Sequence, residues 1–158
     1  AALGHRLLGD EKMIISQNGD NPAAAICLGL APWIQLPLPK TIDRNFEEFL
    51  DTFTEMKRHG RAYLKLLDRE AAAFEDEVRV YGFICLEHSN AAESSITKLN
   101  GKDLVPVFLE NCVCTSLDQH DLCKKIEKIL GSTRCFRLRY NTFDQGARAA
   151  INLVQSDA

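Results

Sequence analysis

The sequence contains no long apolar run: none approaches the roughly 18–20 residues that a membrane-spanning helix requires. Its start lacks the basic-then-apolar layout of a signal peptide. It also contains no Gly-x-Ser-x-Gly elbow, no His-Glu-x-x-His and no phosphate-binding Gly-rich loop before a helix. We therefore expect neither a membrane protein nor an enzyme, and we expect no cofactor.

An excess of basic charge is missing as well. The net charge is -3 over 158 residues, which argues against sequence-blind binding to phosphates but leaves room for a local basic patch. The apolar fraction of 46% and the charged fraction of 26% are typical of a globular protein. The abrupt start of the chain, and its end just after a predicted helix, suggest a piece of a longer protein.

Six cysteines are scattered through a chain that is long enough to form its own core. This usage fits a reducing compartment, so we expect an intracellular protein, cytoplasmic or nuclear, with free thiols. Four residues that can bind zinc lie close together, Cys112, Cys114, His120 and Cys123. Structural zinc sites usually separate paired cysteines by two residues rather than by one, so we expect no metal.

Hydrophobic spacing and capping signals divide residues 1–110 into alternating elements. Capping boxes at Asn45–Glu48 and Asn90–Glu93 each predict the start of a helix. Pro106 lacks a ladder donor, so a strand around it is expected at a sheet edge. In chain order we expect strands at 13–16 and 24–30, a helix from 43 or 45 to 56, strands at 62–68 and 78–87, a helix from 90 to 101, and a strand at 104–110.

This order of elements, β-α-β-β-α-β over 24–110, predicts a ferredoxin-like α+β fold: one antiparallel sheet with both helices on one face. The opposite face would be open, and its central strand would present Arg79, Tyr81 and Phe83 there. We expect an N-terminal extension at 1–22 and a first module at 23–110.

The remaining residues, 111–158, predict a partial second copy packed on the first module. A helix at 118–130, a strand at 134–140 and a helix beginning at Asp144 follow one another there. The segment YNTFDQGARAAINLV parallels the earlier ICLEHSNAAESSITKL in its strand, turn, cap and helix pattern. We interpret this as an internal repeat of about 55 residues.

Residues 79–86, RVYGFICL, resemble the octamer of the RNA recognition motif family at six of eight positions. The departures are Val80 in place of a glycine and Leu86 in place of an aromatic residue. The predicted second helix with its Asn100-Gly101 ending also resembles the family, as does the segment 26–30 on the predicted first strand.

The resemblance implies a module of an RNA-processing or RNA-silencing ribonucleoprotein that binds single-stranded RNA on its open sheet. Tyr81 and Phe83 would then stack on unpaired bases, and Arg79 would contact a phosphate. Lys65 could add to this contact from a neighbouring strand. Arg137 and Arg139, which share one face of the predicted strand 134–140, could also hold phosphates.

Two other interpretations stay open. A second layer could cover the sheet, which would make Tyr81 and Phe83 ordinary packing residues. The chain could instead be an RRM-like protein-interaction module of the same kind of assembly, because the Pro-rich stretch 31–42 carries more apolar surface than an RNA binder needs. The candidate residues there are Trp33, Ile34, Leu36 and Leu38. The sequence does not indicate an oligomeric state.

Overall fold

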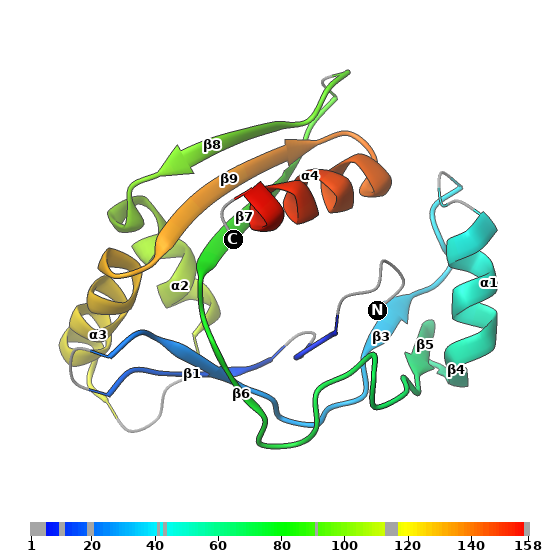
Figure 1. The fold of residues 1–158 in the computed structure, drawn as a ribbon, viewed down its shortest axis with the longest axis horizontal. Helices are drawn as coiled ribbons and strands as arrows, with labels where there is room; N and C mark the ends of the chain where they lie inside the picture. Colours follow the sequence, from blue (N-terminus) through cyan, green and yellow to red (C-terminus); the bar gives the residue numbers. More distant parts are fainter. Residues whose placement is uncertain are drawn as a thin grey trace. The chain divides into compact units, whose positions relative to one another are not determined.

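A computed structural model describes residues 6–9, 12–18, 21–40, 42, 44–90, 92–112 and 117–156. The chain divides into two compact units (Figure 1). Unit 1 comprises Ala1–Ser16 and Ala24–Val78, and unit 2 comprises Gln17–Ala23 and Arg79–Ala158. This division does not coincide with the predicted ranges 23–110 and 111–158. None of the helices in the described part has the length and apolar character that a membrane crossing requires.

Two small sheets and one helix make up most of unit 1. The strands β1 (Ile14–Ser16) and β2 (Ala24–Ile26) pair antiparallel, and β6 (Glu77–Arg79) lies on the other side of β2. The short strand predicted at 13–16 is therefore confirmed. A second sheet has the order β3-β5-β4. Its elements, with the helix of the unit, are β3 (Trp33–Gln35), α1 (Arg44–Phe53), β4 (Thr54–Arg58) and β5 (Arg61–Leu64).

The helix predicted to continue to Met56 ends at Phe53, and the chain enters β4 directly. His59 and Gly60 have φ values of 50° and 72°, and together they connect β4 to β5. Two successive residues in the left-handed region suit the tight turn of a hairpin, whose twist matches that of the strands. The sequence Lys-Arg-His-Gly at 57–60, directly after the predicted helix, is therefore the end of a hairpin strand and its turn.

The predicted strand at 78–87 is two strands. β6 ends at Arg79, and β7 (Gly82–His88) begins after Val80 and Tyr81. The Val80 N–H donates to the carbonyl of Ala23 at 2.8 Å. Arg79, Tyr81 and Phe83 consequently do not alternate along one strand, and the open face predicted for the octamer is not formed.

Unit 2 is built around a mixed three-stranded sheet with the order β7-β9-β8. The central strand runs parallel to β7 and antiparallel to β8. The elements of unit 2 after β7 are β8 (Ser95–Leu99), a 3-10 turn η1 (Gly101–Leu104), α2 (Val105–Asn111), α3 (Gln119–Gly131), β9 (Arg134–Tyr140) and α4 (Phe143–Ser156). The central strand of the sheet is β9. The helix, strand and helix predicted from 118 onward are confirmed.

Two predictions for residues 90–110 are wrong. The expected second helix is the edge strand β8, because Ile96 and Thr97 are β-branched and the segment pairs with β9. The expected last strand is α2, and Pro106 lies in its first turn, where a missing N–H leaves no helical bond unmade. The internal repeat fails for the same reason, since 84–99 form strand, loop and strand whereas 140–154 lead into a helix.

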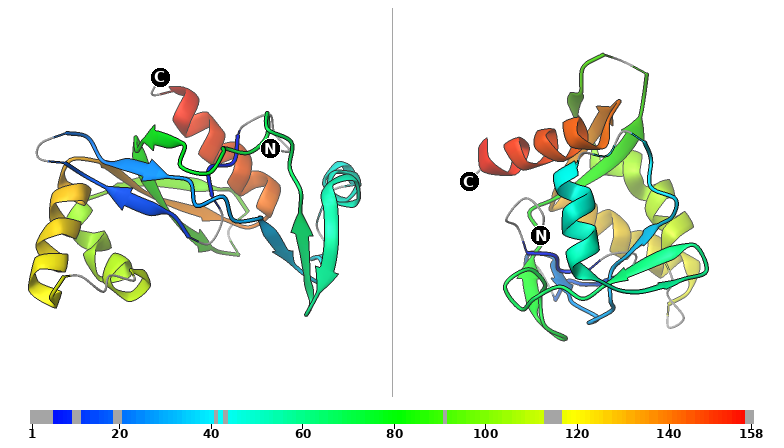
Figure 2. Two further views of the ribbon diagram at one scale, coloured as in Figure 1. Left: turned by 90° about the horizontal axis from the view of Figure 1, so that it is seen from below. Right: turned by 90° about the vertical axis from the view of Figure 1, so that its right-hand side faces the viewer.

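The mixed α+β class is confirmed, but the single ferredoxin-like sheet is not. The described strands between 24 and 110 belong to three separate sheets instead of one. The core of unit 2 lies between its sheet and the pair α2 and α3, where Leu104, Ile126, Leu130 and Cys135 are buried. α4 lies on the other face of the sheet (Figure 2). There, Gly146 of α4 lies against the ring of Tyr140.

Candidate nucleic-acid interface

Tyr81 and Arg79 come together at the entrance to β7. The Tyr81 side chain is 66% exposed, and the guanidinium of Arg79 lies 5.2 Å from the centre of its ring. Arg134, the first residue of β9, donates from Nε to the carbonyl of Tyr81 at 3.4 Å. An exposed ring and two arginines therefore share one small area, which can offer a base a stacking surface and a phosphate a cation.

Phe83 is not part of that area. Its ring packs edge-on against Phe108 of α2, with 4.9 Å between the ring centres. It is half-buried and belongs to the apolar cluster around Leu130 and Cys135. The prediction of two neighbouring open rings is therefore wrong, because α2 and α3 cover the sheet face on which Phe83 lies.

Arg137 and Arg139 lie further along the same sheet face and meet at Glu87 of β7. Arg139 Nε donates to Glu87 Oε1 at 3.1 Å, and Arg137 Nε lies 3.5 Å from Glu87 Oε2. All three side chains are between 42% and 51% exposed. The parallel register sets Arg139 opposite Glu87 and Arg137 opposite Cys85, so the strands themselves hold the cluster together.

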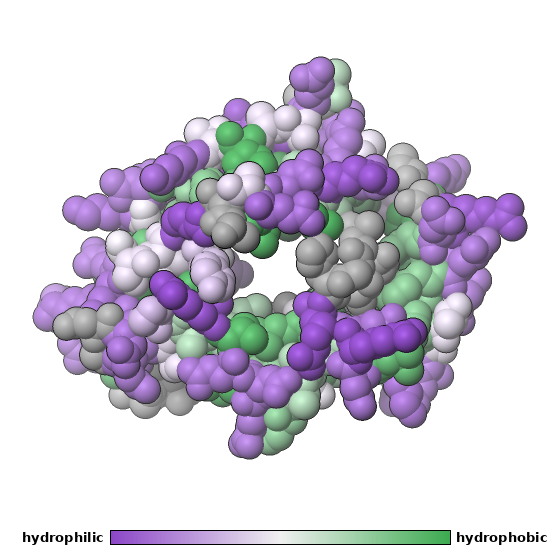
Figure 3. Space-filling model, viewed as in Figure 1, coloured by the Kyte–Doolittle hydropathy of each residue, from purple (hydrophilic) through white to green (hydrophobic). Residues whose placement is uncertain are grey.

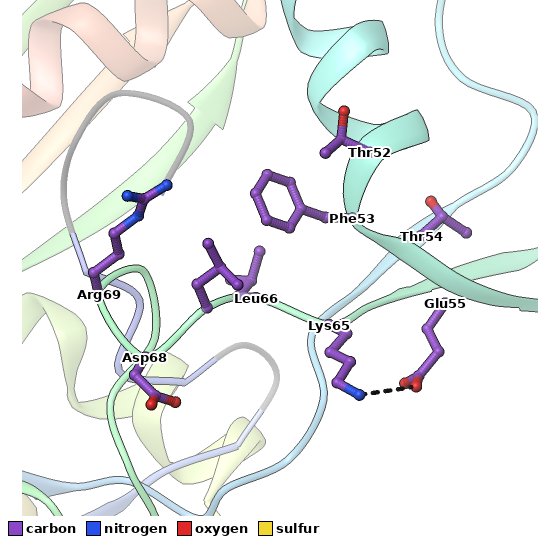
Figure 4. A pocket seen from close by; sticks show the side chains of 9 residues that line it. Thr52, Phe53, Thr54, Glu55, Lys65, Leu66, Asp68 and Arg69 are labelled. Carbon is purple, nitrogen blue, oxygen red and sulfur yellow. Dashed lines mark ion pairs between the residues drawn. The ribbon is translucent and has the colours of Figure 1, made fainter.

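Lys65 lies in unit 1, in an ion pair with Glu55 at 3.5 Å. The pair borders a hollow of about 700 Å³ between the end of α1, the start of β4 and the segment after β5. In Figure 4 the side chains of Phe53 and Leu66 point toward one another across this hollow, whereas that of Asp68 points away. The charge of Lys65 is matched by Glu55, and the other predicted RNA contacts belong to unit 2.

The four apolar candidates for protein binding are half-buried in unit 1. Trp33 and Ile34 belong to β3, which lies at the edge of its sheet. The guanidinium of Arg61 lies over the Trp33 ring at 3.7 Å. Leu36 and Leu38 follow in the Pro-rich stretch, where the Leu36–Pro37 peptide bond is cis. The face drawn in Figure 3 carries hydrophilic side chains with hydrophobic patches between them.

Sequence reasoning missed three rings at the far end of the unit 2 sheet: His88, Tyr140 and Phe143. The His88 and Tyr140 ring centres lie 5.7 Å apart, and those of Tyr140 and Phe143 lie 6.1 Å apart. Only the spacing of Tyr140 and Phe143 is visible in the sequence. The approach of His88 depends on a strand pairing between residues 52 positions apart.

Two titratable groups of unit 2 have shifted pKa values. The hydrogen bond from Arg148 lowers the pKa of the Asp144 carboxyl, and the two side chains approach to 2.8 Å. Burial raises the pKa of the Cys135 thiol. The five described cysteines are free, and the described residues contain no cluster of three or more metal-ligating side chains. Cys114, one of the zinc-capable residues, lies outside the described residues.

No protein-family model, curated protein or solved structure matches this chain.

Proposed function

We propose that unit 2 binds single-stranded RNA, with Tyr81 as a stacking surface and arginines as phosphate contacts. The observation that carries the proposal is the pairing of an open tyrosine ring with the Arg79 guanidinium at 5.2 Å. Stacking of one base on such a ring contributes about 1–3 kcal/mol. Arg137 and Arg139 add two cations on β9, with side chains that are 42% and 51% exposed.

The distribution of charge supports unit 2 over unit 1. Unit 1 contains nine lysines and arginines against 12 aspartates and glutamates, whereas unit 2 contains ten of each. An anionic strand is repelled less by unit 2, and the arginines of β9 give that unit local positive charge. Because these contacts are electrostatic and lie near solvent, we expect salt to weaken binding, and Glu87 reduces this dependence by offsetting part of the charge.

This proposal rests on the residues and not on a ferredoxin-like sheet. The family that the octamer resembles stacks two or more bases on an uncovered sheet, and here α2 covers Phe83. Tyr81 alone offers a stacking surface to fewer bases than two neighbouring rings would. We therefore expect a short footprint, to which phosphate contacts contribute most of the affinity.

The test is a fluorescence-anisotropy titration of the full chain with labelled oligouridine. Tyr81→Ala should weaken binding at least about fivefold, the equivalent of about 1 kcal/mol of lost stacking. Phe74→Ala is the matched control, because Phe74 of unit 1 is 65% exposed and Tyr81 is 66% exposed. Equal affinity of the Tyr81 variant and the natural chain would show that Tyr81 does not stack on RNA.

The edge position of β3 favours a second candidate function, binding of a protein partner. An added strand can pair along the outer side of an edge strand, and Trp33 and Ile34 could contact the side chains of that added strand. Such binding should persist at high salt and should be lost in Trp33→Ala but retained in Tyr81→Ala. RNA binding should show the opposite pattern for both variants.

A further inference from the structure

Three aromatic side chains gather where β7 and β9 end and α4 begins. His88 ends β7, Tyr140 ends β9, and Phe143 begins α4. The His88 ring stands edge-on to the Tyr140 ring at 89°, and the Tyr140 and Phe143 rings are tilted by 44°. Phe143 is 56% exposed, His88 is exposed and Tyr140 is half-buried.

The backbone fixes two of these rings. Tyr140 lies against Gly146, whose missing side chain leaves the ring its space: a Cβ there would lie 3.0 Å from Tyr140 Cγ. The Nε2 of His88 lies 2.9 Å from the carbonyl oxygen of Asn141. Phe143 therefore presents an open ring beside two positioned ones, and this arrangement suits the face and edge of a planar ligand.

A cation, Arg139, lies at the same end of the sheet. Arg139 directly precedes Tyr140 and pairs with Glu87, which directly precedes His88. Alternation along the strands puts Arg139 and Glu87 on one face of the sheet and His88 and Tyr140 on the other. In open α/β sheets, ligands bind beyond the carboxyl ends of parallel strands, and β7 and β9 are parallel and end here.

We propose that this end of the sheet is a nucleotide site: a base stacks on Phe143 beside Tyr140 and His88, and an adjacent phosphate contacts Arg139. The single strand crosses the end of the sheet between the two faces. This inference rests on the proposed RNA binding and identifies a base-binding surface separate from Tyr81.

The experiment separates stacking from simple apolar packing. The probes are a labelled oligouridine and an abasic oligomer with the same backbone. Phe143→Leu should weaken binding of oligouridine at least about fivefold, and Phe143→Trp should restore it, because only an aromatic ring stacks. Binding of the abasic oligomer should be the same for all three chains. Phe74→Leu in unit 1 is the control and should leave both affinities unchanged.

A second measurement locates the contact. Ultraviolet cross-linking of oligouridine to the natural chain, followed by peptide mass spectrometry, should label the segment from Tyr140 to Phe143. Circular dichroism of each variant reports whether α4 and the sheet remain folded.

Two results would overturn the inference alone. The first is an unchanged oligouridine affinity in Phe143→Leu while Arg139→Gln weakens binding, since the phosphate contacts would then act without this stacking surface. The second is an equal loss of both oligomers in Phe143→Leu, because this pattern indicates altered packing. If the natural chain binds neither oligomer, the inference and the proposed function are both wrong.

Discussion

Glu87 is the residue that most directly controls the charge of the arginine cluster. Its carboxylate contacts Arg137 and Arg139 at once, at 3.5 and 3.1 Å. A phosphate that approaches either guanidinium must compete with this internal counter-ion. Because all three side chains are about half exposed, the competition takes place in a high dielectric and each contact contributes only a modest free energy.

We predict that Glu87→Gln strengthens RNA binding about two- to tenfold at low salt, because it removes a competing charge beside two cations. The plot of log affinity against log salt concentration should also become steeper. Fluorescence anisotropy over a range of salt concentrations measures both quantities. Glu55→Gln is the matched control, since Glu55 forms an ion pair with Lys65 at 3.5 Å in unit 1. Weaker binding by the Glu87 variant would show that the carboxylate positions the arginines instead.

Alanine substitutions of Tyr81 and Phe83 should change the free energy of unfolding by different amounts. Phe83→Ala should lower the free energy of unfolding by about 2–3 kcal/mol, below the usual range for a fully buried ring because Phe83 is half-buried against Phe108. Tyr81→Ala should change it by no more than about 0.5 kcal/mol, as expected of an exposed side chain. Urea unfolding followed by circular dichroism measures both. Equal losses would contradict the assignment of Phe83 to the core.

At the scale of elements, local signals predicted the chain from residue 118 onward well. Asp118 accepts a hydrogen bond from the Asp121 N–H at 2.9 Å, as a helix cap should, and α3 buries Ile126, Ile129 and Leu130. The alternation of residues 134–140 likewise predicted β9 with its bounds. Such elements are recognisable because their caps and periodicity lie within the element itself.

Elements that depend on distant partners were not predictable. Residues 90–101 carry a capping box, yet Ser95–Leu99 gain more by pairing with β9, about 40 residues away in the sequence. The octamer reads as one strand, but the chain changes sheets after Arg79. Arg79 and Tyr81 are two residues apart in the sequence, and their side chains lie close together in the structure. The burial of Phe83 depends on α2, an element that the sequence predicted as a strand.

Two glycines, Gly60 in the β4–β5 turn and Gly131 at the end of α3, provide tests of the observed secondary structure. Gly60→Ala should destabilise the chain by about 1–2 kcal/mol, because φ is 72° in the β4–β5 turn and a side chain is strained there. No atom would clash with the new Cβ, so the backbone alone accounts for the loss. Gly131→Ala should be neutral or stabilising by up to about 1 kcal/mol, since this last residue of α3 does not have a positive φ and nothing lies near its Cβ. Thermal unfolding measures both changes, and an unaffected Gly60 variant would contradict the hairpin turn.

At the scale of the whole molecule, the two units divide the charge unequally. The excess of acidic residues lies in unit 1, and the arginine cluster lies in unit 2. The net charge of -3 therefore conceals a unit with as many basic as acidic residues. The average composition could exclude a generally basic RNA binder, but it could not reveal a local site.

The most direct test is a nuclear magnetic resonance titration of the isotope-labelled full chain with oligouridine, in which every backbone amide reports its own environment. Our account predicts that shifts concentrate in unit 2, at the entrance to β7 around Tyr81 and at the ends of β7 and β9 around Arg139. Shifts confined to β3 and its neighbours in unit 1, or no shifts at all, would contradict it.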